Sequence, residues 1–362
     1  MLEWVYHRGV IDPEAMTNLS KLERRELAAA WTFLSGVTVA HQQATDGTQK
    51  LLIEWDDASP VPTAAASVEE PERARIALPM AGSGDTSRQT ECVMIPSTDP
   101  TGTRRTACIS SQVGCPVGCR FCASGLGGLE GNLSTGRIVE QVWRLDQMVK
   151  MTAEAMGQPR ETARISNIVF MGMGEPLSNF KAVVNAVRTL AAPWGLNIGA
   201  RRITISTVGL PKFIERLAEE LELPVTLALS LHAPTDDIRR KLIPWAEYTT
   251  IAELLGACRK WFDKTGREIT LEYTLLRGVN DQPEHAAQLA SLAKQLRANI
   301  NLIRYNEVSG LPFQRPLDEG VREFQRILRL RNVNTHIRAS RGRDIAAACG
   351  QLRHEKAGAG SA

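Results

Sequence analysis

The chain has 362 residues, 43% of them hydrophobic, and can therefore bury the core of one large domain with a small addition. Its formal net charge of +3, from 43 Lys and Arg against 40 Asp and Glu, is too small to indicate a polyanionic partner without local evidence. Residues 1–16 are polar and charged where a signal peptide needs an apolar run, and no later segment reaches membrane-spanning length. We therefore expect a cytoplasmic monomer with no membrane partner, which argues against secreted and membrane proteins.

The N-terminal residues 1–45 are predicted to form a small helical accessory domain. Asp12-Pro13 begins one short helix, and Asn18-Leu19-Ser20 is a suitable cap for a longer helix over residues 21–34. The helical pattern continues to about residue 39.

Residues 46–105 are predicted to contain short strands at 49–55 and 91–96. The segment between these strands is rich in Ala, Pro and Ser, which is typical of a long loop, although residues 74–80 offer a further strand. This region therefore predicts a short β extension.

From residue 106 to about residue 350, strand-like and helix-like segments alternate. The predicted strands cover residues 106–114, 165–172, 201–209, 224–233, 268–278, 299–306 and 335–340. The predicted helices cover residues 136–151, 179–191, 211–221, 250–262, 283–296 and 321–331. About six or seven βα units predict an α/β fold in which a parallel sheet forms a partial, TIM-like (β/α)6 barrel over residues 106–350. Chemistry in such a fold gathers at the strand ends, and residues 351–362 are predicted to be a disordered tail.

Three cysteines, Cys115, Cys119 and Cys122, lie in one loop with the sequence CPVGCRFC. Their thiolates can converge on one metal centre without help from distant segments. A [4Fe-4S] cluster bound by three cysteines keeps one iron open, and the amino and carboxylate groups of S-adenosylmethionine (SAM) can chelate that iron. Reductive cleavage of the C–S bond then gives a 5′-deoxyadenosyl radical. The sequence therefore predicts a [4Fe-4S] cluster and SAM as cofactors.

A structural zinc site is the main alternative for these cysteines. Such a site normally has four closed ligands and a Cys-x2-Cys pair with a second pair nearby. Here three residues separate the first two cysteines, while Cys108 offers a fourth ligand. A non-catalytic RNA-binding protein stabilised by zinc therefore remains the alternative from a different functional class.

The other cysteines differ in their context. Seven cysteines cannot all pair with one another, which favours a reducing compartment over a disulfide scaffold. Cys92 and Cys258 are expected to be small buried apolar residues. Cys349 lies in a glycine-flanked segment near the C-terminus, where inert core packing is less expected, and Cys108 precedes the cysteine loop.

Polar residues follow the ends of several predicted strands. Gly172 and Gly174 allow close approach of the backbone, and Glu175 supplies a carboxylate that suits the amino group of SAM. Three further strand ends carry Ser206, Ser230, Leu231, His232 and Asn306. These groups could surround the nucleoside and the methionine carboxylate through hydrogen bonds, although each alone is compatible with ordinary turn chemistry.

Basic residues lie in or beside predicted loops. They are Arg104-Arg105, Arg201-Arg202, Arg239-Arg240-Lys241, Arg338, Arg341 and Arg343. Contacts with phosphates need such residues, but a solvated surface has the same composition. The pattern is therefore only suggestive of RNA binding.

Together, the motifs resemble the RlmN family of radical SAM methyltransferases, which modify C2 of adenine in RNA. The resemblance covers nearly the whole chain, from LEWVYHRGVIDPEAMTNLSK through CISSQVGCPVGCRFC, FMGMGEPLSN, ISTVG, SLHAP, LLRGVND and IRYN to RGRDIAAACGQL. It implies a radical SAM barrel and two substrates, 23S rRNA at the peptidyl-transferase centre and tRNA at the adenosine beside the anticodon. It also implies reduced ferredoxin or flavodoxin as the electron donor.

The resemblance also implies roles for three residues outside the cysteine loop. Cys349 takes a methyl group from one SAM and becomes S-methylcysteine; the radical from a second SAM then activates this methyl for addition to adenine C2. Glu91 matches the position of the proton acceptor. Cys108 releases the protein–RNA adduct by forming a transient disulfide with Cys349. The same resemblance implies that the strand-end residues Glu175, Ser206, Ser230 to His232 and Asn306 bind SAM.

The closest alternative within this chemistry is the C8-methylating resistance enzyme Cfr, which shares the cysteines and the position of Glu91. Relatives of that type tend to have Ala after the Gly-Glu pair and lack the Arg-Gly tail, so Pro176 and Arg341-Gly342 favour C2. The target base must be unstacked to enter a barrel mouth, which suits loop substrates. The chain departs from the family in a shortened N-terminal domain and a long loop over residues 56–90.

Overall fold

One curved sheet organises the part of the chain that the computed structural model describes, which is residues 1–56, 89–97 and 104–352. Across the sheet, the strands follow the order β1 (Gly36–Gln43), β2 (Gln49–Trp55), β3 (Gln89–Pro96), β4 (Arg105–Cys108), β7 (Asn167–Phe170), β8 (Ile203–Thr207), β9 (Thr226–Ser230), β10 (Ile269–Leu275), β11 (Ala298–Arg304) and β12 (Thr335–Arg338). Neighbours from β1 to β4 are antiparallel. Neighbours from β4 to β12 are parallel. Within the described residues β1 and β12 remain edges, so the sheet is the open, partial barrel that the sequence predicts.

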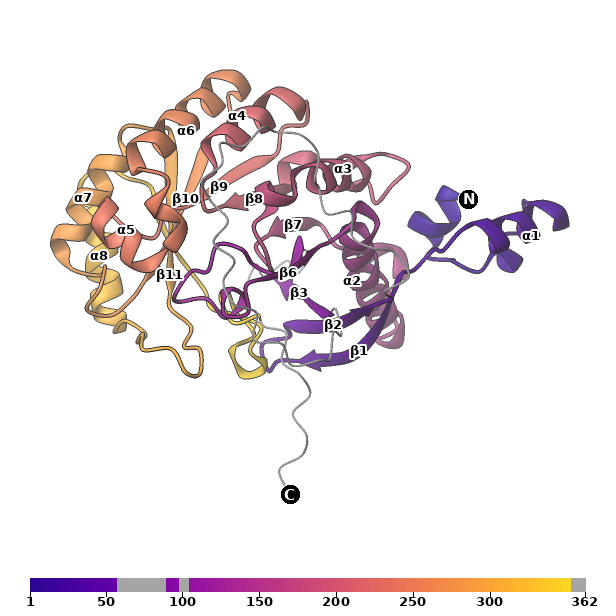
Figure 1. Cartoon of the computed structure of the whole chain (residues 1–362). Coiled ribbons are helices and arrows are strands. Elements are labelled where there is room, and N and C mark those ends of the chain that lie inside the picture. The colour runs from indigo at the N-terminus through magenta and orange to yellow at the C-terminus, as the bar shows by residue number, and fades with distance from the viewer. Residues whose placement is uncertain (57–88, 98–103, 353–362) are drawn as a thin grey trace.

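Helices cross between the parallel strands and follow the outer side of the curved sheet (Figure 1). They are α2 (Thr135–Ala155), α3 (Phe180–Ala191), α4 (Pro211–Glu220), α6 (Ile251–Thr265), α7 (Pro283–Ala293) and α8 (Asp318–Leu330). The helix α5 (Asp236–Leu242) packs instead against the cysteine loop. In α8, Val321, Phe324 and Leu328 recur at helical spacing and are buried, as expected for a helix with one face on a sheet. The short α5 was not predicted, because seven residues show little periodicity. No helix in the described ranges is both long and apolar enough to cross a membrane.

The N-terminal region contains helical turns at Glu3–Arg8 and Pro13–Ala15 and the helix α1 (Lys21–Ala30). A capping box formed by Ser20 and Glu23 begins α1, so the predicted cap is confirmed. Figure 1 shows these segments projecting from the molecule on the side of β1. The region therefore forms an appendage, as expected from its pattern.

The helical prediction was wrong beyond α1. We predicted a helix to residue 34 and a helical region to residue 45, but residues 36–43 form β1. Val37, Thr38 and Val39 are β-branched and favour an extended chain. At Gly36, a Cβ atom would lie 2.7 Å from the Trp55 ring, so strand pairing needs glycine there.

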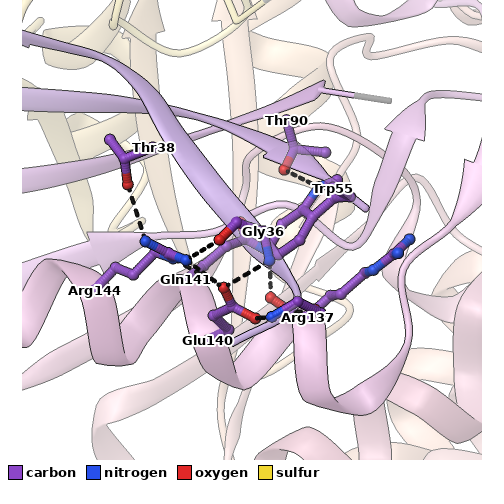
Figure 2. Close-up of polar contacts among 9 residues, drawn as sticks. Gly36, Thr38, Trp55, Thr90, Arg137, Glu140, Gln141 and Arg144 are labelled. Atoms are coloured by element: carbon purple, nitrogen blue, oxygen red, sulfur yellow. Dashed lines mark hydrogen bonds and ion pairs between the residues drawn. The ribbon is translucent and has the colours of Figure 1, made fainter. Parts of the chain in front are cut away.

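A buried network attaches β1 to α2 (Figure 2). Glu140 on α2 accepts hydrogen bonds from the backbone N–H groups of Ser35, at 2.8 Å, and Gly36, at 3.2 Å. Arg144 pairs with Glu140 at 2.7 Å and donates to Thr38 Oγ1 at 3.2 Å and to the carbonyl of Gly36. Since both charged side chains are largely buried, the contacts fix where the antiparallel strands join the rest of the molecule.

The strand predicted over residues 106–114 is divided in two. Residues 105–108 form β4, whereas β5 (Gln112–Gly114) pairs with β6 (Leu129–Asn132) in a separate two-stranded sheet. Between them, Ser110 turns the chain by donating from Oγ to the carbonyl of Glu91 at 2.7 Å and accepting from Met173 N at 2.9 Å. The cysteine loop is therefore held between two paired strands.

Some predictions lie outside the described residues. These are the strand proposed at 74–80, most of the 56–90 loop and the tail from residue 353 onward. The first residues of the predicted tail are ordered by contacts, because Leu352 is 4% exposed and its carbonyl accepts from Ser124 Oγ at 2.6 Å. The prediction of disorder was therefore wrong for residues 351–352.

Candidate functional site

A pocket lies at the carboxyl ends of the parallel strands, where the fold places ligand sites. Its walls come from the cysteine loop, the turn after β7, the ends of β8 to β12 and the C-terminal segment. The predicted site residues that line it are Cys115, Cys119, Cys122, Gly174, Glu175, Ser206, Ser230, His232 and Cys349. Residues more than two hundred positions apart in sequence therefore share one cavity.

The three loop cysteines are free, partly exposed and border this pocket together. Local hydrogen bonds hold the loop: Cys115 N donates to the carbonyl of Gly128 at 2.8 Å, and Cys122 N to that of Cys119 at 3.1 Å. Burial raises the pKa of all three thiols, to about 12 for Cys115, and the Cys119 thiol is also disfavoured as an anion by its cysteine neighbours. Binding to iron would remove these protons and satisfy the buried sulfur atoms.

The donor set fits an iron–sulfur cluster better than one zinc ion. In the described part of the chain, no three His, Cys, Asp or Glu side chains form a group that could hold a metal ion. Zinc needs its ligands converging on one ion, whereas the cysteines around a cluster bind separate irons. Cys108, the potential fourth zinc ligand, packs instead with Val93 and Met173 in another cluster of side chains.

The turn after β7 contains two glycines at positions where neighbouring atoms leave no room for a side chain. Gly174 has φ +103°, and a Cβ there would lie 2.7 Å from Gln112 Cβ; one at Gly172 would lie 2.7 Å from the Ile109 backbone. Glu175 is 4% exposed, and its carboxylate accepts from Leu177 N at 3.0 Å and Val208 N at 2.8 Å. Burial raises the pKa of Glu175, while these hydrogen bonds oppose the rise. The carboxylate is thus oriented at the pocket wall.

The serines and the histidine come from neighbouring strand ends. Ser206 Oγ and Ser230 Oγ lie 3.2 Å apart. His232 has φ +56°, and its Nδ1 accepts from Thr274 N at 3.0 Å. Burial, with the charge of Arg239, lowers the pKa of His232 to about 3, so the ring is neutral. Leu231 is completely buried in the hydrophobic core and is not among the described residues that line the pocket.

Cys349 is exposed at the pocket, and hydrogen bonds to the backbone of its segment hold it there. The Cys349 carbonyl accepts from Asn306 Nδ2 at 3.2 Å, and the Gly350 carbonyl accepts from Ala123 N at 2.8 Å. Asn306 is almost fully buried, and its Oδ1 accepts from Arg315 at 3.2 Å. Asn306 therefore contacts the segment of Cys349, whereas its predicted contact with SAM stays a prediction.

Cys108 is buried at the end of β4 and packs with Ala347 and Leu352, on either side of Cys349 in the sequence. Burial raises the pKa of Cys108 to about 12, and the nearby Cys349 adds to this rise. Desolvation also raises the pKa of Cys349. The structure thus brings together the two cysteines that we singled out outside the loop. Cys92 and Cys258 are fully buried, as predicted.

Glu91 lies on β3 and is only 5% exposed. Its Oε1 is 2.6 Å from Nζ of Lys50 on β2. Glu91 is not among the described residues that line the pocket, but its carbonyl is linked through Ser110 to the turn after β7. The orientation of the Glu91 carboxylate therefore decides whether it can accept a proton from a base in the pocket.

The chain is similar in sequence to known proteins. Residues 109–290 match the model of the Radical SAM superfamily. The chain is 40% identical over 359 residues to a probable dual-specificity RNA methyltransferase RlmN of Salinibacter ruber, with 98% of this chain and 87% of that protein covered. The corresponding protein of Symbiobacterium thermophilum is 43% identical over 357 residues, with 98% and 84% covered. This chain belongs to the RlmN family of radical SAM RNA methyltransferases.

A solved structure supports the same assignment. The crystal structure of a radical SAM methyltransferase from Sphaerobacter thermophilus matches with a TM-score of 0.83 and 40% sequence identity. The match covers 98% of this chain and 92% of that one. The resemblance seen in the sequence is therefore confirmed at the level of family and fold.

Two basic residues of this RlmN-family chain are not the surface contacts that the sequence suggested. Arg239 is completely buried and donates from Nη2 to the carbonyl of Val208, and its charge lowers the pKa of Cys119 against the effect of burial. Arg338 lines the pocket, and its Nη1 is 3.2 Å from Met171 Sδ. Of the basic residues singled out from the sequence, those that are exposed are Arg104, Arg201, Arg202, Lys241 and Arg343.

Sequence reasoning missed Glu272 and Asn280. Glu272 on β10 borders the pocket, is 3% exposed, and its Oε2 has no hydrogen-bond partner within the described structure. Asn280 is fully buried, and its Nδ2 donates to the carbonyls of His232 and Thr274, each at 2.8 Å. Glu272 stood inside an apolar strand pattern and Asn280 inside the motif LLRGVND, so buried polar residues in these segments were the available signal.

Proposed function

We propose that this enzyme methylates C2 of adenosine in 23S rRNA, at the peptidyl-transferase centre, and in tRNA, beside the anticodon. The observation that supports the proposal is that Cys349 and the three-cysteine loop line one pocket, while Cys108 packs against the residues on either side of Cys349, in a chain of the RlmN family. An ordinary SAM methyltransferase has no need for such cysteines. Adenine C2 is a poor nucleophile toward the electrophilic methyl group of SAM. A methyl group held on a cysteine beside a radical source can instead be converted to a carbon radical that adds to C2.

In this proposal Cys115, Cys119 and Cys122 hold a [4Fe-4S] cluster, and the pocket holds SAM beside it. Bound together, cluster and SAM supply a methyl group in one use and a hydrogen-abstracting carbon radical in the next. The Glu175 carboxylate accepts hydrogen bonds from the amino group of SAM, and the other strand-end residues surround the nucleoside and the carboxylate of SAM. They are Gly174, Ser206, Ser230, His232 and Asn306, whereas Leu231 is buried in the core and is left out of this set. The unpaired Oε2 of Glu272 is a further acceptor in the same cavity.

Cys349 carries the methyl group between the two stages of a ping-pong reaction. Its sulfur accepts the methyl by displacement, and the activated methyl carbon then joins adenine C2 while still attached to Cys349. Glu91 accepts the proton that leaves C2, and the one electron that the adduct must lose would return to the cluster that supplied it. The Cys108 thiolate then attacks the sulfur of Cys349 to form a disulfide, the bond between Cys349 and the new carbon breaks, and that carbon takes up a proton to become the methyl group of the product. The packing of Cys108 against Ala347 and Leu352 supports this exchange.

The RNA substrate reaches the pocket with its base unstacked, because the reacting carbon is otherwise enclosed in a helix. Exposed basic residues that follow strand ends, such as Lys241 on α5 and Arg343 in the segment of Cys349, can contact phosphates. Reduced ferredoxin or flavodoxin is the proposed electron donor, and a cytoplasmic monomer is the proposed state of the enzyme. Pro176 and Arg341-Gly342 support C2 over C8 as the target.

One experiment tests the reaction. Anaerobically reduced enzyme is incubated with SAM and a 23S rRNA fragment or tRNA, and the RNA is digested to nucleosides for mass spectrometry. We expect 2-methyladenosine, and none when the reductant is omitted. If only 8-methyladenosine forms, the enzyme has Cfr-type specificity. Zinc in place of iron and sulfide in the anaerobically purified protein would contradict the radical mechanism.

A further inference from the structure

Lys50 and Glu91 form a buried ion pair between β2 and β3. Their atoms Nζ and Oε1 are 2.6 Å apart, and the two side chains are only 10% and 7% exposed. In the register of the sheet, Lys50 lies opposite Val93 and Leu52 lies opposite Glu91, so Lys50 and Glu91 are diagonal neighbours on one face. Leu51 and Ile53 point to the other face, into the main core. A lysine therefore occupies an inner position of β2, where an apolar residue is the usual occupant.

The same face of the sheet carries Cys108. Val93 pairs with Lys50 on one side and with Cys108 on the other, so the three residues form a row across β2, β3 and β4. Val93 and Cys108 pack against Ala347 and Leu352 of the C-terminal segment. The Lys50–Glu91 pair thus lies in the layer that receives the segment of Cys349.

Lys50 also contacts that segment directly. Its Nζ donates to the carbonyl of Ala346, three residues before Cys349, at 3.5 Å. Ala346 has φ +49°, a left-handed conformation that costs energy for a residue with a Cβ atom and needs support from its neighbours. One ammonium group therefore contacts both the carboxylate of Glu91 and the backbone next to Cys349.

A buried ion pair is a poor source of stability, because desolvation of the two charges offsets most of their attraction. Lys50 is therefore better explained by what it orients. We propose that Lys50 is a positioning residue, which fixes the carboxylate of Glu91 relative to the Cys349 segment. The inference rests on the proposed function, in which Glu91 accepts the proton from adenine C2. Lys50 itself touches neither SAM nor RNA in this proposal.

Removal of Lys50 should affect one stage of the reaction and spare the other. Methyl transfer to Cys349 does not use Glu91, and the segment keeps its contacts with Ala123 and Ser124. Proton removal from the protein–RNA adduct does use Glu91. We expect Lys50→Met to methylate Cys349 normally, to form 2-methyladenosine at least about tenfold more slowly and to accumulate the covalent adduct.

The test compares four proteins: the unaltered enzyme, Lys50→Met, Lys50→Arg and Lys150→Met. Lys150 is a matched control, because it forms a similarly buried ion pair with Asp146 at 2.7 Å within α2, away from the pocket. Cys349 methylation is read from intact-protein mass, the adduct from a denaturing gel and the product from the nucleoside digest. Arginine keeps the charge and should restore most of the rate, and Lys150→Met should match the unaltered enzyme.

The inference is overturned if Lys50→Met forms product at the unaltered rate, or if Lys150→Met shows the same deficit and the same adduct. A misfolded Lys50→Met would lose Cys349 methylation as well, so Glu91→Gln and the double variant provide a second test. If Lys50 acts through Glu91, the double variant is no slower than Glu91→Gln alone, whereas multiplied losses contradict the proposal. If the unaltered enzyme forms no 2-methyladenosine, the proposed function fails first, and the inference fails with it.

Discussion

The parallel and antiparallel parts of the sheet treat the site differently. The parallel part, from β4 through β7 to β12, forms the pocket from strand ends and tight turns, such as the Gly174 turn beside Gln112. The antiparallel part, β1 to β3, contributes none of the described lining residues. It holds the C-terminal segment instead, through Asp46 in the turn between β1 and β2 and through Lys50.

This difference indicates a division of labour around Cys349. One end of its segment binds the cysteine loop, which borders the pocket with the parallel part, where Ser124 donates to the Leu352 carbonyl. The other end binds the antiparallel part, where Gly342 N donates to Asp46 Oδ2 at 3.0 Å and Thr45 N donates to Asp344 Oδ2 at 2.9 Å. The parallel part would bind the cofactors, and the antiparallel part would place the carrier cysteine against them.

The largest expected effect separates the two cysteines at this junction. Cys349→Ala should lower formation of 2-methyladenosine below about one thousandth of the unaltered rate and form no adduct, because nothing carries the methyl. Cys108→Ala should accumulate a covalent protein–RNA adduct, since release fails. Denaturing gels and nucleoside digestion measure both. The control is Cys258→Ala, because Cys258 is a buried cysteine of α6 outside the pocket; it should neither slow product formation nor accumulate the adduct. Equal adduct levels in Cys349→Ala and Cys108→Ala would refute their separate roles.

An intermediate effect is expected from a change confined to the parallel part. Gly174→Ala places a Cβ 2.7 Å from Gln112 Cβ at φ +103°, which should destabilise the fold by about 1–3 kcal/mol and weaken SAM binding. Urea unfolding and equilibrium dialysis with SAM measure the two losses. Gly256→Ala in α6 meets no atom within 4 Å and should be neutral or slightly stabilising. Unchanged stability and SAM affinity in Gly174→Ala would show that the turn is not rigid.

The smallest effect should come from the antiparallel part. Burial alone would raise the pKa of Asp46, but hydrogen bonds from Thr48 and Gly342 outweigh burial and lower it. The ionised form therefore adds stability above the unfolded pKa of about 3.9, which is lost as pH falls through the lower folded pKa. Asp46→Asn should cost about 1 kcal/mol near neutral pH and remove this part of the acid dependence.

Urea unfolding between pH 2.5 and 7 measures the change at Asp46. The control is Asp237→Asn, because Asp237 is a highly exposed carboxylate on α5 and its pairing with Arg240 contributes little. If both variants show the same pH dependence as the unaltered protein, the anchor between the antiparallel part and the Cys349 segment is energetically unimportant.

Much of the fold and site could be predicted from the sequence, because the deciding signals are local. The three loop cysteines fall within eight residues, and each βα unit shows its own hydrophobic period. Strand β2 was predicted with the bounds that the structure shows. The error at β1 arose where a short alternating strand follows a helix without a strong boundary, so pairing with β2 decided its form.

The sequence by itself therefore determined the cysteine loop, the alternating architecture and the family, because spacing and periodicity lie within a few residues of one another. Only the tertiary structure decided that Arg239 is buried near Cys119, that Arg338 and Glu272 enter the pocket and that Lys50 pairs with Glu91. The identity of a charged residue does not show whether it lies on the surface or in the core. Its burial and its partner depend on strand register and on distant segments folding together, which no local pattern contains.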